Sequence, residues 1–113
     1  MALFLHLCCG VSELLVRAPA VLDRASRRAF RRKALAAVSR YPATGPVGSR
    51  RIVVDLEQTR KVDSAGLGTL VLVREHAAER RWTVCLRGAS EELRFLLALT
   101  RLEDRFEFEP PGR

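Results

Sequence analysis

Cysteine, histidine and aromatic residues are scarce in this chain. The three cysteines, Cys8, Cys9 and Cys85, are too few and wrongly spaced for a disulfide framework or a zinc site, so a reduced, cytoplasmic setting is expected. Long apolar runs are also missing, and none approaches the ~18 residues of a membrane-spanning helix. The apolar start, residues 1–10, has no basic leader region and no Ala-x-Ala cleavage site, and His6 interrupts it, which favours a strand over a signal peptide.

The length of 113 residues suits one domain, here residues 1–113, and is too short for two. Acidic residues are rare in the first half: residues 1–50 hold 9 Lys and Arg against 2 Asp and Glu, whereas residues 51–113 hold 11 against 11. The whole net charge of +7 therefore comes from the first half.

Hydrophobic periodicity predicts alternating strands and helices. The expected elements are strands at 2–8 and 14–18 with a turn at 9–13, a helix from Asp23 or Ser26 to about Val38, a loop at 41–50, a strand at 51–56, a polar turn at 57–61, a helix following residues 62–68 and ending near Arg80, a strand at 82–86, a helix opening at Ser90, and a strand at 105–109. The nearly continuous apolar strand at 51–56 is typical of a central strand in a parallel pair. The alternation predicts an α/β fold, a mixed β-sheet with helices packed on it.

Helical spacing predicts the inner faces of the first and third helices. They are Phe30, Ala34, Ala37 and Val38 in the first, and Leu93, Leu96, Leu97 and Thr100 in the third. Opposite the first of these faces, Arg24, Arg27, Arg28 and Arg31 form one basic stripe. The stripe is interpreted either as a solvated face or as a surface close to anionic lipid. Nucleic acid is not an expected partner, because the few aromatic residues are not interleaved with the arginines.

No catalytic constellation is present in the sequence. His76 follows Ser64 by 12 residues on the same expected helix, roughly 18 Å away, which is too far for it to act as a base for that serine. The paired carboxylates Glu91 and Glu92 are most simply charges at the start of a helix. The chain is therefore expected not to be an enzyme, and no metal or cofactor is expected.

The segment Asp63-Ser64-Ala65-Gly66-Leu67-Gly68 lies where a buried strand gives way to a helix. Its glycines allow a close backbone approach, and a phosphate on the serine would meet unpaired N–H groups and the positive end of the helix dipole. The alternative interpretation is that Asp63 or Ser64 only caps the helix and that the glycines only serve packing.

This segment resembles the motif of the STAS domain family, typified by bacterial anti-sigma factor antagonists. The resemblance extends over residues 51–109 through Val53 to Leu56, Trp82 to Leu86 and Leu93 to Phe106, and more weakly over Leu15 to Leu35. It implies a mixed sheet of about five strands with helices on one face. A basic first helix is not part of the family motif.

Two functions follow from this resemblance. In the first, the chain binds an anti-sigma factor Ser/Thr kinase, so that the sigma factor is released to regulate transcription, and phosphorylation of Ser64 ends the binding. The implied partner-binding residues are Asp23, Asp63, Ser64, Ala65, Gly66, Leu67 and Gly68. In the second, the chain is a STAS subunit bound to the ATPase of an Mla-type ABC lipid transporter, with the basic stripe near the anionic inner leaflet.

Overall fold

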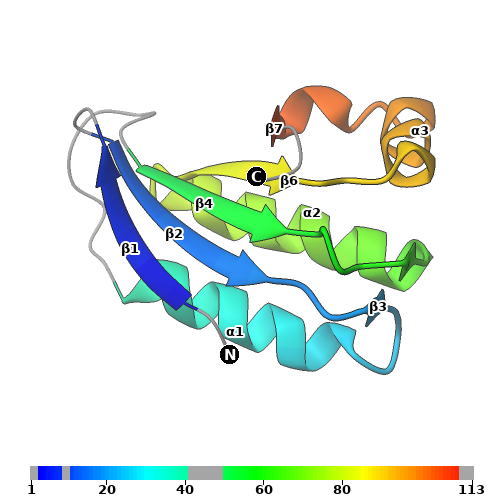
Figure 1. Cartoon of the computed structure of the whole chain (residues 1–113), viewed down its shortest axis with the longest axis horizontal. Coiled ribbons are helices and arrows are strands. Elements are labelled where there is room, and N and C mark those ends of the chain that lie inside the picture. Colours follow the sequence, from blue (N-terminus) through cyan, green and yellow to red (C-terminus); the bar gives the residue numbers. More distant parts are fainter. Residues whose placement is uncertain (1–2, 9–10, 41–49, 110–113) are drawn as a thin grey trace.

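The computed structural model describes residues 3–8, 11–40 and 50–109, in which strands and helices alternate around one hydrophobic core (Figure 1). The elements are β1 (Leu3–Cys8), β2 (Val11–Arg17), β3 (Val21–Leu22), α1 (Arg27–Ser39), β4 (Arg50–Asp55), β5 (Lys61–Val62), α2 (Ser64–Glu79), β6 (Thr83–Arg87), α3 (Glu91–Leu99), a short 3-10 turn (Glu103–Arg105) and β7 (Glu107–Glu109). The expected loop at 41–50 lies outside the described residues except for Arg50, which begins β4.

The main sheet has five strands in the order β1-β2-β4-β6-β7 (Figure 1). β1 and β2 are antiparallel and the other neighbours are parallel, which confirms the predicted mixed sheet. β4 lies between β2 and β6, and Ile52, Val53 and Val54 are buried, as expected for a central strand.

The two ends of the chain depart from the predicted boundaries. β2 begins at Val11, so residues 11–13 belong to the strand and not to the expected turn. Its register places Glu13 opposite Arg51 of β4, where the two side chains form an ion pair at 3.2 Å. β7 is shorter than the predicted strand at 105–109. Arg105 belongs to the 3-10 turn, and the residues that pair with β6 are Glu107 to Glu109.

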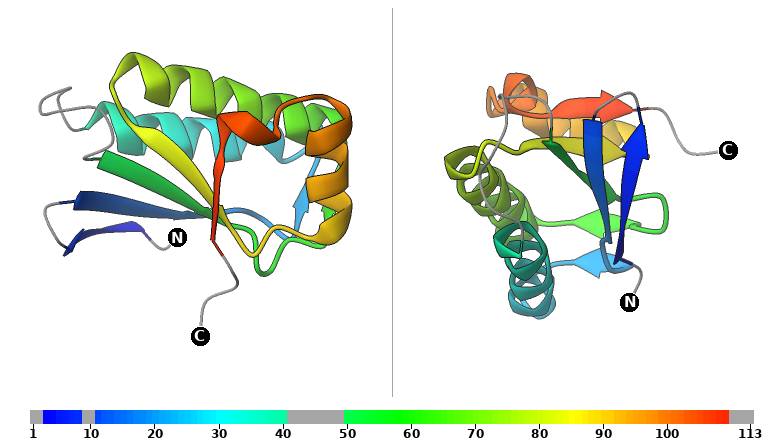
Figure 2. Two further views of the ribbon diagram at one scale, coloured as in Figure 1. Left: turned by 90° about the horizontal axis from the view of Figure 1, so that it is seen from above. Right: turned by 90° about the vertical axis from the view of Figure 1, so that its left-hand side faces the viewer.

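α1 and α2 lie side by side against one face of the main sheet (Figure 2). All four predicted inner residues of α1 are buried, and α2 contributes Leu70, Val73 and Ala77 to the same core. Both helices begin at the end of the molecule where β4 and β6 end and where α3 lies (Figure 1). Within the described ranges, no helix combines the length and the apolar character that a bilayer crossing requires.

A second sheet of two short strands joins β3 to β5 at this same end (Figure 1). The strands are parallel, with Val21 opposite Lys61 and Leu22 opposite Val62. Sequence periodicity indicated only a polar turn at 57–61, because a strand of two residues is too short to show a period. The small sheet holds the segments that lead into α1 and α2 next to each other.

α3 turns fewer residues toward the core than the spacing predicted. Leu93 and Leu97 are buried and Leu96 is half-buried, but Thr100 is exposed, so its assignment to the inner face is wrong. The helix ends at Leu99, and the Thr100 hydroxyl instead donates to the carbonyl of Leu96 at 2.8 Å. Ser90 is the predicted cap of this helix, and its hydroxyl accepts the Leu93 N–H at 3.1 Å.

An arginine with left-handed backbone follows the last residue of α2 and of α3 by two positions: Arg81 has φ 65° and Arg101 has φ 59°. This conformation costs a residue with a Cβ roughly 1–2 kcal/mol, and glycine avoids the cost. We expect Arg81→Gly and Arg101→Gly each to raise the free energy of unfolding by about 0.5–1 kcal/mol in urea titrations. Arg80→Gly is the matched control: Arg80 has φ −105°, so this variant should give no gain. A loss of stability in both test variants would contradict the expectation.

Candidate functional site

The segment at residues 63–68 forms the junction between β5 and α2. Asp63 has extended backbone, φ −93° and ψ −174°, and its Oδ1 accepts the N–H of Gly66 at 2.9 Å. Asp63, not Ser64, therefore caps the helix. α2 begins at Ser64 and not after Gly68, because both glycines are accommodated inside its first turns. The Ser64 side chain is exposed, so a partner or a modifying enzyme can reach it.

Gly66 is held against the backbone of β3. A Cβ at this position would lie 2.2 Å from the carbonyl oxygen of Leu22, the atom that also accepts the Asp63 N–H at 3.2 Å. Gly68 differs, because nothing lies within 4 Å of a Cβ built there. The first glycine is therefore required by a close approach that positions Ser64, whereas the second leaves open space beside it.

Ser64 opens onto a groove between α1 and α2. The groove has a volume of about 360 Å³. Its walls are Arg27, Arg28 and Arg31 from α1, and Ser64, Ala65, Gly68, Thr69 and Leu72 from α2. We call this the Ser64 groove. Leu72 is 50% exposed, which makes it an apolar contact point in an otherwise polar and basic surface.

The Ser64 groove is strongly electropositive. Arg27, Arg28 and Arg31 are exposed, and none of the ion pairs found among the described residues involves them. In the described part of the chain, no acidic side chain lines the groove, and the N-terminal end of α2 adds a positive partial charge. The arrangement favours an anionic group on a partner or on Ser64 itself.

Asp23 lies in the turn that leads into α1. Its Oδ1 accepts the N–H groups of Ala25 at 3.0 Å and Ser26 at 3.1 Å, while the Ser26 hydroxyl donates to the Val21 carbonyl at 2.6 Å. Asp23 and Ser26 thus stabilise the turn before α1, and Ser26 is the N-cap residue of the helix but makes no side-chain capping bond to it. Arg24 also belongs to the turn, so α1 carries only three of the four arginines of the predicted stripe.

The structure places three of the seven predicted site residues in the groove and the other four outside it. Ser64, Ala65 and Gly68 line the Ser64 groove, whereas Gly66 faces β3 and Leu67 packs against the core. Asp63 and Asp23 are half-buried: Asp63 caps α2, whereas Asp23 stabilises the turn before α1. The partner-binding role of all seven residues remains a prediction.

Sequence reasoning identified the serine motif and the arginine stripe separately and missed that they face each other. Thr69 and Leu72 were also missed as groove residues. Only the packing of α1 beside α2 brings these side chains together, and no local pattern encodes that packing.

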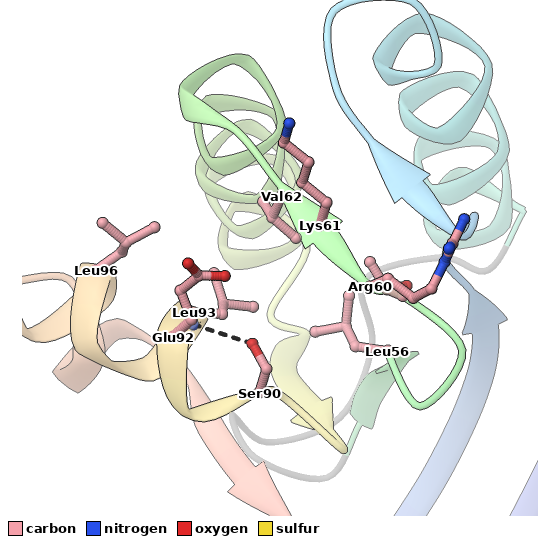
Figure 3. A pocket seen from close by; sticks show the side chains of 9 residues that line it. Leu56, Arg60, Lys61, Val62, Ser90, Glu92, Leu93 and Leu96 are labelled. Carbon is pink, nitrogen blue, oxygen red and sulfur yellow. Dashed lines mark hydrogen bonds between the residues drawn. The ribbon is translucent and has the colours of Figure 1, made fainter.

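A second hollow lies between β5 and the start of α3 (Figure 3). Leu56, Val62 and Leu93 are among the residues that line it, and Ser90 caps the helix beside it. Its free volume of about 10 Å³ is room for about one water molecule. This hollow serves the packing of α3 and is too small for a ligand.

The sheet face opposite α1 and α2 carries a network of ion pairs. Arg51 contacts Glu13 at 3.2 Å and Glu107 at 3.3 Å, and Arg87 contacts Glu109 at 3.0 Å. Cys85 is 1% exposed among these groups. Burial, followed by the charge of Glu109 and the hydrogen bond to it, raises the pKa of the Cys85 thiol to about 12.

We expect Cys85 to resist alkylation in the folded protein. A rise in pKa from 9.0 to about 12 lowers the thiolate fraction at pH 8 by about a thousandfold, and burial blocks access as well. Iodoacetamide labelling at pH 8, followed by peptide mapping at this residue, should show that slowing relative to protein in urea. Similar rates in the two states would contradict the expectation.

His76 lies near the far end of α2 from Ser64, and its Nε2 is 3.1 Å from the Ser39 hydroxyl. It does not line the Ser64 groove. In the described part of the chain, no three His, Cys, Asp or Glu side chains are grouped closely enough to hold a metal ion.

Solved structures share this fold across nearly the whole chain. A putative anti-sigma factor antagonist from Thermotoga maritima aligns with a TM-score of 0.69 at 17% identity, covering 97% of this chain and 86% of the other. The Bacillus cell fate determinant SpoIIAA in its phosphorylated form aligns with a TM-score of 0.65 at 17% identity, covering 99% and 93%. These likenesses show the fold.

Sequence comparison identifies the family. A STAS-domain containing protein of Pseudomonas aeruginosa is 40% identical over 58 residues, which are 51% of this chain and 57% of that relative. The matched region therefore spans little more than half the length of the relative. A family model described as "Mlab, STAS domain" matches residues 11–108. The chain belongs to this STAS domain family.

Proposed function

We propose that this protein is a non-catalytic interaction module of the anti-sigma factor antagonist type, working in the cytoplasm. In its unmodified form it binds an anti-sigma factor Ser/Thr kinase through the Ser64 groove, and phosphorylation of Ser64 ends the binding. The observation that carries the proposal is the exposed Ser64 at the first position of α2, held by the Asp63 cap and the Gly66 contact beside an open groove.

The surroundings of Ser64 suit a switch and offer no catalytic machinery. Among the described residues that line the groove, none is a His, Asp or Glu that could act as a base for the Ser64 hydroxyl, and His76 lies near the other end of the helix. The fold is shared with the anti-sigma factor antagonist SpoIIAA, which has been determined in a phosphorylated form, and this supports phosphorylation as the means of control. A phosphate would bring about −1.5 to −2 charges into a contact surface whose shape was complementary without it.

Binding to purified anti-sigma factor kinases from the same genome tests the proposal. Ser64→Asp places a negative charge at the switch, and Ser64→Ala keeps the site neutral and removes only the hydroxyl. We expect Ser64→Ala to bind like the unmodified protein and Ser64→Asp to bind at least about thirtyfold more weakly, a difference of about 2 kcal/mol. Equal affinities of the two variants, or no phosphate on Ser64 after incubation with the kinase and ATP, would refute the switch.

A second candidate is a STAS subunit bound to the ATPase of an Mla-type ABC lipid transporter. The family description "Mlab, STAS domain" over residues 11–108 favours it. In that role Ser64 would contact the ATPase permanently, and the stripe of Arg24, Arg27, Arg28 and Arg31 would lie near the anionic inner leaflet, where each basic group that the ATPase leaves uncovered contributes about 1 kcal/mol.

The two candidates predict different companions for the protein in its own cells. Stable co-purification with an ABC ATPase, with Ser64 unmodified in the recovered protein, supports the transporter subunit. Recovery with a kinase, and a phosphorylated fraction that is absent from the complex, supports the switch.

A further inference from the structure

Three arginines of α1 line the same groove as Ser64, and the family motif does not predict a basic first helix. Arg27, Arg28 and Arg31 lie on the first turns of α1 and line the same groove as the Ser64 hydroxyl on α2. Arg51 pairs with Glu13 and Glu107, and Arg87 pairs with Glu109, whereas none of the ion pairs among the described residues involves the three groove arginines. The groove arginines thus offer donors to an anion placed at Ser64.

A phosphoserine provides that anion. It carries about −1.5 to −2 charges at neutral pH and three strong acceptor oxygens. Guanidinium groups bind phosphate oxygens through paired, charge-assisted N–H donors, which are stronger than neutral hydrogen bonds. A phosphate on Ser64 would stand at the mouth of a groove with three such groups on the opposite wall.

We propose that the phosphate of phosphorylated Ser64 is held within the molecule by Arg27, Arg28 and Arg31, tying α1 to α2 across the groove. This inference rests on the proposed phosphorylation of Ser64 and specifies how it acts. The phosphate binds the guanidinium groups that are available to a partner in the unmodified protein. The three arginines carry three positive charges and the phosphate about two negative ones, so the groove keeps a small net positive charge. Phosphorylation therefore ends binding by occupying the arginines that the partner would contact, and not by giving the groove a negative charge.

The test uses protein with phosphoserine incorporated at position 64 during translation, so that it requires neither kinase nor partner. The second pKa of phosphoserine is about 6 in the absence of neighbours, and nearby cations lower it. We expect ³¹P NMR titration to give a value about one unit lower in the phosphorylated wild type. We also expect the phosphate to raise the midpoint of thermal unfolding.

Matched double variants separate the groove arginines from the general charge of the helix. Arg27→Gln with Arg31→Gln should return the phosphate pKa most of the way toward 6 and abolish the gain in thermal midpoint. Arg32→Gln with Arg40→Gln removes the same charge from exposed positions outside the groove and should change neither. Arg27→Lys with Arg31→Lys keeps the positive charge but removes the paired N–H donors of the guanidinium groups. This variant should give an intermediate phosphate pKa and an intermediate gain in thermal midpoint. It also serves as the informative variant if the glutamine pair fails to fold.

One result overturns the inference: a phosphate pKa that is the same in the wild type and in both double variants of Arg27 and Arg31. That result would leave the proposed switch intact if the kinase still modified Ser64 and binding still ended. Conversely, absence of any kinase for Ser64 would refute the proposed function while the lowered phosphate pKa remained measurable on the incorporated phosphoserine. The two failures are therefore distinguishable.

Discussion

Gly66→Ala is expected to destabilise the fold by about 3 kcal/mol, near the upper end of what one added methyl group costs in a packed site. The methyl carbon would lie 2.2 Å from the Leu22 carbonyl oxygen and 2.9 Å from its carbonyl carbon. Both are backbone atoms, which cannot move aside as a flexible side chain would. Relief requires α2 and β3 to separate, which lengthens the Asp63 N–H contact to the same oxygen.

Gly68→Ala is the matched control, because it makes the same chemical change two residues along the same helix. No atom lies within 4 Å of the added methyl group, and alanine favours helix over glycine by up to about 1 kcal/mol. This variant should therefore be as stable as the wild type or more so. Urea unfolding followed through Trp82, which is the chain's single tryptophan and is 3% exposed, measures both changes. Equal stability of the two variants would contradict the close approach.

The two glycine variants also separate the positioning of Ser64 from direct contact between the groove and a partner. Gly66→Ala acts on Ser64 through the backbone, so its effect on partner binding should accompany the loss of stability. Gly68→Ala places a methyl group in the Ser64 groove and should weaken partner binding without loss of stability. The motif Asp-Ser-Ala-Gly-Leu-Gly thus contains one glycine that builds the site and another that keeps it open.

Strong local signals made much of the fold predictable from the sequence. The apolar run of β4 and the helical spacing of Phe30, Ala34 and Val38 in α1 each predict burial, and the structure confirms it. Such elements turn a continuous face or run toward the core, so their composition carries the information. The five-stranded mixed sheet followed from their alternation.

The missed features are those fixed by distant partners. β3 and β5 have two residues each and exist because Leu22 and Val62 meet across 40 residues of chain. The ends of α2 and α3 lack the glycine that usually marks a helix end, since Arg81 and Arg101 adopt the left-handed conformation instead. Thr100 was assigned to an inner face because the spacing continued past the point where the helix stops.

The charge distribution becomes intelligible once the two faces of the molecule are compared. On the sheet face opposite α1 and α2, Arg51 and Arg87 pair with Glu107 and Glu109 of their own half of the chain, and Arg51 also pairs with Glu13 of the first half. The excess of the first half gathers on α1, where Arg27, Arg28 and Arg31 border Ser64. Three of the nine basic residues in residues 1–50 therefore lie beside the candidate site, and the other six lie elsewhere on the molecule.

Leu70→Ala and Leu72→Ala should separate the stability of α2 from its role in binding. Leu70 is fully buried, and truncation of such a leucine costs about 3 kcal/mol through lost burial and the cavity left behind. Leu72 is 50% exposed, so its truncation should change the free energy of unfolding by no more than about 0.5 kcal/mol. The sequence run of residues 70–73 is apolar throughout and could not tell these two leucines apart.

In a partner-binding measurement, we expect Leu72→Ala to have the larger effect and Leu70→Ala the smaller one. Leu72 lines the Ser64 groove among arginines, and an exposed apolar side chain beside charged neighbours is a natural anchor for a partner. We expect Leu72→Ala to weaken binding to the partner, whether kinase or transporter ATPase, about tenfold, a loss of about 1.4 kcal/mol. The folded fraction of Leu70→Ala should bind with wild-type affinity, because Leu70 does not reach the groove. If Leu72→Ala binds normally while Ser64→Asp does not, the partner contacts the helix start and not the groove wall, and the interface is smaller than the one proposed.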